Sequence, residues 1–138
     1  TGVNFTDAVL TEANFGRANL TDAILTGATG NKVNFTDAIL KRANLDDVEL
    51  TNAIFTDAIL TSADMRNADL QGALFSNADC QLADFTGANL TGAYFDGAEL
   101  GSADFTGADL TGAFFGGAKA TVNTIWPAAG RPAGVIIG

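Results

Sequence analysis

Residues 83–112 read ADFTG-ANLTG-AYFDG-AELGS-ADFTG-ADLTG, which is one five-residue unit written six times. The same phase extends along most of the chain. Every residue number divisible by five from 5 to 115 is Phe, Leu, Met or Cys, with Gly30 as the single exception. Two positions earlier, from 3 to 118, the residue is Ala, or Val at Val3, Val33 and Val48. A fixed period over this length predicts a repeat architecture.

A five-residue period fits neither an α-helix nor a flat strand. On a helix, five residues advance by about 500°, so the large apolar residues would spread around the whole surface. A strand alternates its faces every two residues. The chain must therefore turn a corner in each repeat. The corner position, two residues after the large apolar one, is mostly Asp, Asn or Gly, which tolerate the positive φ at the third residue of a type II turn.

The identity of the large apolar residue indicates how many sides close one coil. Steps of fifteen residues mix Phe15, Gly30 and Leu45, whereas steps of twenty give an unbroken column of Phe15, Phe35, Phe55, Phe75, Phe95 and Phe115. Stacking identical side chains at the strand spacing of about 4.8 Å packs one coil on the next. We therefore predict an all-β quadrilateral parallel β-helix, a solenoid of about six four-sided coils of about 20 residues.

The units ANLTD at 18–22, ANLTG at 88–92 and ADLTG at 108–112 follow one pattern: a small residue, Asn or Asp, Leu or Phe, and two polar residues. This pattern, in register from 3 to 122, resembles the pentapeptide-repeat family. The resemblance implies a right-handed quadrilateral β-helix. It implies no single function, because the family includes many proteins of unknown role alongside a few that mimic DNA and bind topoisomerase.

The composition excludes several functions. The chain has 16 acidic and 7 basic residues, and its net charge of −9 disfavours direct binding to nucleic acid or anionic lipid. With no His and one Cys, it cannot assemble a transition-metal site or a Ser-His or Cys-His pair. We therefore expect no enzyme, no catalytic residue, no cofactor and no metal. No apolar run is long enough to span a membrane, so we expect a soluble mature or trimmed chain, in cytoplasm, periplasm or thylakoid lumen.

The residue before each large apolar one should point outward, since the two alternate along the strand. On the Phe side this position becomes apolar in four successive coils, which define the apolar ladder: Ile54, Leu74, Tyr94 and Phe114. Ile39 and Ile59 hold the same position on the adjoining side. Two interpretations stay open: stabilisation of the sheet face by stacked neighbours, or a contact surface for a partner.

The outward position on the other two sides carries carboxylates, here called the acidic ladders: Glu49, Asp69 and Asp109 on one side, and Asp64, Asp84 and Asp104 on the other. Carboxylates one coil apart repel, so we expect raised pKa values and a preference for a counter-cation. The ladders are interpreted as solvated faces, as mimics of a phosphate backbone, or as weak cation sites. Because they line a convex wall without a cleft, we do not expect catalysis there.

Three residues break the core pattern. Gly30 predicts a weakly packed coil, either a local packing defect or bulge, or a recognition notch. Cys80 and Met65 occupy core columns, so we expect both to be buried and inert. The alternative for Cys80 is a redox-sensing thiol, which burial and the absence of a basic neighbour in sequence disfavour.

The repeat ends near Ala120, and we assign residues 1–120 to the β-helix and 121–138 to a C-terminal cap containing Ile125, Trp126 and Pro127. An open solenoid end must be covered, because it exposes unpaired strand edges and the Phe core. The alternative is a dimerisation element. The TIWP segment at 124–127 resembles the Trp-Pro endings of some cyanobacterial family members. At the other end we expect that an N-terminal segment has been removed or that the first coil stacks on another molecule.

These observations predict a non-enzymatic structural or interaction scaffold that presents rigid acidic and apolar faces to an unidentified protein partner of basic character. A homodimer through a coil end is compatible with the same features. The alternative is a DNA-mimicking protein that binds topoisomerase (gyrase), which the resemblance implies and the net acidity suits. The predicted partners include neither nucleic acid nor membrane.

Overall fold

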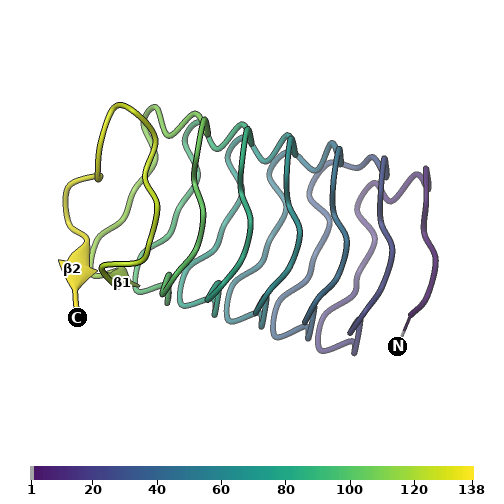
Figure 1. Ribbon diagram of the computed structural model, residues 1–138. Coiled ribbons are helices and arrows are strands. Elements are labelled where there is room, and N and C mark those ends of the chain that lie inside the picture. Colours follow the sequence, from purple (N-terminus) through teal and green to yellow (C-terminus); the bar gives the residue numbers. More distant parts are fainter. Residues whose placement is uncertain (1) are drawn as a thin grey trace.

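The computed structural model describes residues 2–138 as an elongated solenoid, with the two ends of the chain at opposite ends of its axis (Figure 1). Parallel bridges join residues twenty positions apart, for example Asn34 to Ile54 and Ile54 to Leu74. One coil therefore takes four five-residue units, as predicted from the Phe column. Among residues 2–138 no helix has the length and apolarity needed to cross a bilayer.

Each side of a coil contributes a single bridging residue, which makes two backbone hydrogen bonds. Asn34 donates its N–H to the carbonyl of Ala13 at 2.9 Å, and its own carbonyl accepts from Phe15 at 2.7 Å. Two longer strands lie at the C-terminal end, where β1 (Lys119–Ala120) and β2 (Ile136–Ile137) pair in parallel. The ladder of single bridges holds each coil to the next along all four sides.

Most corners have the hydrogen bond and the positive φ of a type II turn, as the Asp, Asn and Gly pattern predicts. At the first corner the N–H of Ala8 donates to the carbonyl of Phe5 at 3.0 Å, and Asp7 between them has a φ of 56°. The same left-handed position falls on Leu82, with a φ of 60°. Since L-residues pay about 1–2 kcal/mol for this conformation, Leu82 occupies an unfavourable corner.

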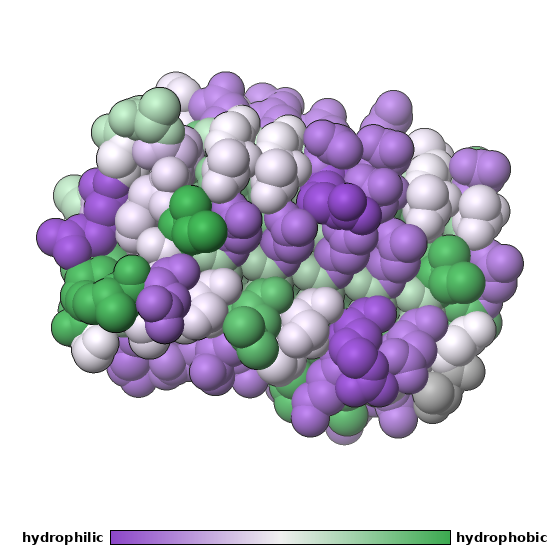
Figure 2. All heavy atoms as spheres, in the orientation of Figure 1, coloured by the Kyte–Doolittle hydropathy of each residue, from purple (hydrophilic) through white to green (hydrophobic). Residues whose placement is uncertain are grey.

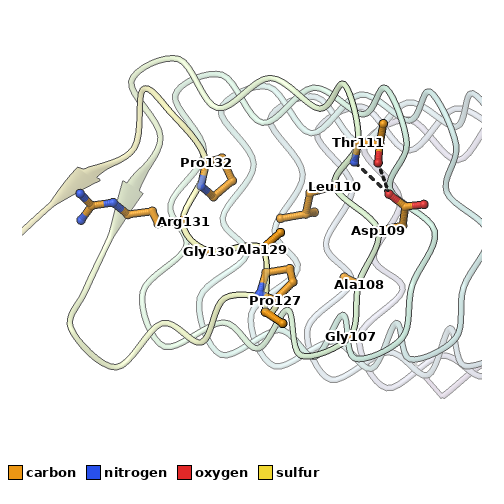
Figure 3. A pocket seen from close by; sticks show the side chains of 11 residues that line it. Gly107, Ala108, Asp109, Leu110, Thr111, Pro127, Ala129, Gly130, Arg131 and Pro132 are labelled. Carbon is orange, nitrogen blue, oxygen red and sulfur yellow. Dashed lines mark hydrogen bonds between the residues drawn. The ribbon is translucent and has the colours of Figure 1, made fainter.

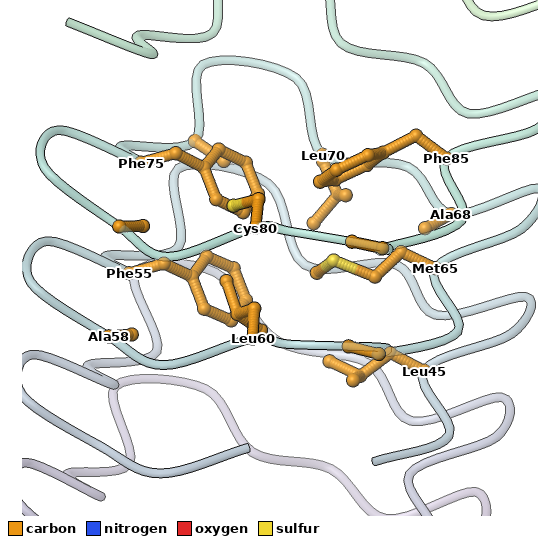
Figure 4. Close-up of a cluster of buried hydrophobic side chains, with 14 of the residues drawn as sticks. Leu45, Phe55, Ala58, Leu60, Met65, Ala68, Leu70, Phe75, Cys80 and Phe85 are labelled. Atoms are coloured by element: carbon orange, nitrogen blue, oxygen red, sulfur yellow. The ribbon is translucent and has the colours of Figure 1, made fainter. Parts of the chain in front are cut away.

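The interior consists of the two predicted columns. Small Ala residues and large Phe or Leu residues are fully buried through the middle of the solenoid. Phe35, Phe55 and Phe75 stack in nearly parallel planes with ring centroids 4.9 and 4.8 Å apart. Phe85 meets Phe75 edge to face at 5.6 Å; Phe55, Phe75 and Phe85 are seen in Figure 4. The Phe column is therefore continuous inside one side of the coil.

The three residues that break the core pattern do not all pack as expected. Met65 and Cys80 are buried, as expected, and burial, with a smaller contribution from Asp79, raises the pKa of the Cys80 thiol. At Gly30 the expected defect is closed: a Cβ there would lie 2.8 Å from a methyl group of Val33 and 2.9 Å from the backbone of Leu10. Val33 replaces the usual Ala and crowds this space, which argues against an empty notch.

The segment after Ala120 folds against the last coil. Trp126 stacks on Phe105 at 5.1 Å with an interplanar angle of 3°, and meets Phe115 edge to face at 5.8 Å. Ile125 continues the bridge ladder by pairing with Asp104. The buried hydroxyl of Thr124 donates to the carbonyl of Leu100 at 2.8 Å. Trp126 thus extends an aromatic column of the core beyond the last Phe residues.

Candidate interaction surface

The apolar ladder is bridged along its whole length, with Ile54 paired to Leu74, Leu74 to Tyr94, and Tyr94 to Phe114. Its exposure increases toward the C-terminal end. Ile54 and Leu74 are half-buried, whereas Tyr94 is 39% and Phe114 53% exposed. The prediction of a solvent-exposed ladder therefore holds at Tyr94 and Phe114 and is only partly met below them, because stacked neighbours cover one another.

Tyr94 and Phe114 form the most accessible part of the ladder. Their rings stack with centroids 4.9 Å apart and an interplanar angle of 14°. Ile39 and Ile59 are bridged to each other on the adjoining side and are half-buried. The corner that joins the two sides beside Tyr94 carries Asp96. Tyr94 and Phe114 therefore present two stacked rings on the surface, with the carboxylate of Asp96 at the adjoining corner.

Other exposed apolar residues are scattered or terminal. Figure 2 shows a largely hydrophilic side of the molecule with scattered hydrophobic residues and one hydrophobic cluster at the C-terminal end. That end carries Val122, Ile125 and Ile136, which are 84%, 50% and 56% exposed.

The acidic ladders have a structural task that the sequence analysis missed. Asp104 accepts hydrogen bonds from the backbone N–H of Thr106 at 2.9 Å and from its hydroxyl at 2.6 Å. Asp109 does the same with Thr111, at 3.0 and 2.6 Å. This is the turn that Asn and Asp side chains make with the backbone two residues on. The signal in the sequence was the recurrence of Thr two residues after Asn or Asp.

The expected rise in carboxylate pKa is wrong for two members of the ladders. A hydrogen bond from Arg66 to Asp64, at 2.6 Å, lowers the pKa of Asp64, and the hydrogen bonds from Thr111 lower the pKa of Asp109. Arg66 also lies 3.9 Å from Asp84. Cations and turn donors thus offset the repulsion between coils.

The remaining carboxylates vary in exposure. Glu49 is exposed, and Asp69 is half-buried and accepts a hydrogen bond from Asn89 at 3.2 Å. Over residues 2–138 no group of three His, Cys, Asp or Glu side chains is arranged to hold a metal ion. The carboxylates of these faces are distributed along the solenoid.

A groove that the sequence did not indicate lies between the last coil and the C-terminal segment (Figure 3). It has a volume of about 580 Å³ and is lined by residues 107–111 on one wall and 127–132 on the other. Leu110 contributes a partly buried side chain to it. Pro127 and Pro132 stand at the two ends of the opposite wall. The signal available in the sequence was this pair of prolines after the repeats end.

Family models match most of the chain. A model described as "Pentapeptide repeat region" matches residues 1–75, and one described as "Pentapeptide repeats (8 copies)" matches residues 63–101 and 98–121. A search of curated proteins returned no match.

Solved structures of repeat proteins are similar in fold. The pentapeptide repeat protein Rfr23 from the cyanobacterium Cyanothece 51142 is 25% identical, with 91% of this chain and 88% of that chain covered and a TM-score of 0.50. HetL, from the cyanobacterium Nostoc and involved in heterocyst differentiation regulation, is 21% identical, with 98% and 85% covered and a TM-score of 0.50. QnrB1, a plasmid-mediated fluoroquinolone resistance protein, is 18% identical, with 100% and 84% covered and a TM-score of 0.51.

Proposed function

The chain belongs to the pentapeptide-repeat family, and we propose that it is a non-enzymatic scaffold that binds a protein partner through the apolar ladder. The observation that carries this proposal is the stacked pair Tyr94 and Phe114 on an outer face of the solenoid. Two exposed aromatic rings on a backbone tied at every coil lose little conformational freedom on binding. Aromatic residues are also the type enriched at the centres of protein interfaces.

A basic partner suits this surface best. Asp96 stands at the corner beside Tyr94. The face of an aromatic ring attracts Lys and Arg, and the net charge of −9 attracts a basic surface at longer range. The partner is thus expected to offer apolar and cationic side chains together.

The absence of an enzymatic role is part of the proposal. The sequence has no His, and its only Cys is buried with a raised thiol pKa. The carboxylates Asp104 and Asp109 are engaged in turns with Thr106 and Thr111. Neither the buried thiol nor these two turn-bound carboxylates is placed to act as a nucleophile or general base.

The proposed architecture is a right-handed quadrilateral β-helix of about six four-sided coils, closed at one end by residues 121–138. Stacking of Trp126 on Phe105 supports the capping role. Ile125 and Ile136 are exposed at this end and could form the contact of a homodimer. Sedimentation at several protein concentrations would detect such a dimer.

Capture from a source lysate tests the proposed function. We expect the native chain to retain a protein that the Tyr94→Asn/Phe114→Asn variant loses. Asn is chosen because Asn14 and Asn34 hold the same outward position in the first coils and are bridged in the same way. The matched control is Val9→Asn/Val122→Asn, which removes exposed apolar area elsewhere. Equal capture by both variants would reject the ladder as the binding surface.

DNA mimicry with topoisomerase (gyrase) binding is the second candidate, and the acidity of the stretch 67–118, which contains no Lys or Arg, favours it. Arg66 weakens it, because it pairs with Asp64 and approaches Asp84 within one acidic ladder. Inhibition of DNA supercoiling by the pure protein, lost when Asp69 and Asp109 are replaced by Asn, would favour this candidate over the apolar ladder.

A further inference from the structure

In the part of the chain that the structure describes, two adjoining sides of the last coil leave backbone groups without backbone hydrogen bonds, and the first of them, the side of Leu110, lines the groove. On the preceding side, Ile125 donates to the carbonyl of Ala103 at 2.9 Å and accepts from Phe105 at 2.8 Å, which completes the ladder. On the next side, within residues 2–138, the carbonyl of Ala108 and the N–H of Leu110 make no backbone hydrogen bond. These two groups are the ones that a bridging residue of a further coil would satisfy. The chain leaves the ladder here at Pro127, which has no N–H to donate.

This open edge forms one wall of the groove. The groove of about 580 Å³ lies between residues 107–111 and the segment 127–132. Leu110, the large apolar residue of this side, is only partly buried, whereas Leu90 one coil below is fully buried. The edge therefore offers the N–H of Leu110 as a donor, the carbonyl of Ala108 as an acceptor, and the side chain of Leu110 as an apolar contact, all spaced as in the coils below.

We propose that this groove binds an extended peptide segment of a partner protein as an added parallel strand, with a Lys or Arg above Asp109 followed by an apolar residue above Leu110. In parallel pairing, one peptide residue can satisfy both Ala108 and Leu110, as Ile125 does for Ala103 and Phe105. Its side chain then stands directly above Asp109. The next peptide residue points inward onto Leu110, because side chains alternate along a strand.

The preference for a cation follows from the ladder itself. Lys119 stands one coil above Glu99, bridged to it, and its Nζ lies 2.8 Å from the carboxylate. A peptide Lys above Asp109 would repeat this geometry. Asp109 is exposed and lies within 4.0 Å of no Lys or Arg nitrogen among residues 2–138. An acidic peptide residue at this position would instead repeat the repulsion between stacked carboxylates.

Arg131 also lines the groove. Its position determines whether its guanidinium competes with a peptide cation for the carboxylate of Asp109. Arg131 also borders a second depression formed with Trp126 and Ile137. Figure 3 shows its side chain directed away from Leu110. Arg131 is thus placed to leave Asp109 to the incoming cation. The edge at Ala108 and Leu110 lies on a different side of the coil from Tyr94, so binding there is tested independently of the proposed function.

The test is an NMR titration of the isotope-labelled 138-residue chain with the peptide acetyl-Ala-Lys-Leu-Thr-Gly-amide. This probe copies residues 108–112 with Lys in place of Asp109. We expect the amide signal of Leu110 to shift and its hydrogen exchange to slow. Methylation of the peptide's Lys backbone nitrogen should reduce affinity at least about tenfold, because it removes the hydrogen bond to Ala108. The same peptide with Asp in place of Lys should bind more weakly.

A protein variant separates the contribution of the Asp109 charge from that of the backbone hydrogen bonds at the open edge. Asp109→Asn keeps an oxygen to accept from Thr111, so the turn is retained while the charge is removed. We expect it to weaken the Lys peptide by roughly two- to fivefold, the scale of an exposed ion pair. An unchanged Leu110 signal at millimolar peptide, equal binding of the N-methylated peptide, or shifts centred on Tyr94 would overturn the proposal.

Discussion

The first and last coils have the same backbone geometry but different outward side chains. Asn14 and Asn34 occupy the outward position of the Phe side at the start, whereas Tyr94 and Phe114 occupy it at the end. The bridges continue through both regions, and so does the Phe stack, with ring centroids 5.3 Å apart between Phe15 and Phe35 and 4.8 Å apart between Phe95 and Phe115. The inward columns therefore determine the fold, and the outward position can change from a polar residue to an aromatic one without altering it.

The residues at the corners also differ between the first and the last coils. In the first coils the left-handed corner position carries charged residues such as Asp7, Glu12 and Arg17, while the later coils use mainly Gly, as at Gly87 and Gly92. Gly adopts positive φ without the steric cost that other residues pay. The C-terminal coils thus combine less strained corners with the more apolar face.

The largest expected effect separates inward from outward residues within one strand. Phe75→Ala should lower the free energy of unfolding by about 3–5 kcal/mol, because it removes a stacked ring from a close-packed column. Leu74→Asn, the adjacent outward change, should lower it by about 1 kcal/mol or less. Chemical denaturation of both variants measures the difference. Similar losses in the two would show that inside and outside have been misassigned.

Removing residues 121–138 should affect the C-terminal coil much more than the first one. The truncation takes away Trp126 and uncovers Phe105 and Phe115. We expect a lower melting temperature together with concentration-dependent association in sedimentation. A monomeric truncated protein that melts like the full chain would rule out the capping role.

The corners provide a matched pair of smaller and opposite effects. Leu82→Gly should raise the free energy of unfolding by roughly 0.5–1 kcal/mol, since it relieves a left-handed Leu that is largely exposed. Gly92→Ala should lower it by a similar amount, although no atom lies within 4 Å of the added Cβ. Thermal melts of the two variants check the signs. Shifts in the same direction would mean that backbone conformation does not control corner stability.

Much of this structure could be predicted, because the relevant signals are local and periodic. The twenty-residue Phe column gave the number of units per coil, and the Asp, Asn and Gly corners gave the turn type. The turns from Asp104 to Thr106 and the shift at Asp64 depend on where hydrogen bonds form, which spacing alone does not tell. The half-burial of Leu74 depends on the size of its stacked neighbours. The groove exists because the segment after Ala120 leaves the ladder at Pro127, and no repeat governs that path.

The smallest predicted effect concerns pH. Arg66 lowers the pKa of Asp64 in the folded chain, so the pair stabilises the fold above the unfolded Asp pKa of about 3.9. This contribution is lost as the pH falls through the lower, folded pKa. Unfolding experiments on the native chain and on Arg66→Gln should therefore differ at neutral pH and converge in acid. A difference that persists or grows in acid would contradict the assigned role of the pair.

The central claim is that the outward apolar ladder serves binding while the inward columns serve folding. The most direct measurement is made on one variant, Leu74→Asn/Tyr94→Asn, by comparing its loss of partner capture from lysate with its loss of unfolding free energy. The account predicts that capture is largely abolished while stability falls by about 1 kcal/mol or less per site. Retained capture, or a loss of stability as large as that of Phe75→Ala, would contradict it.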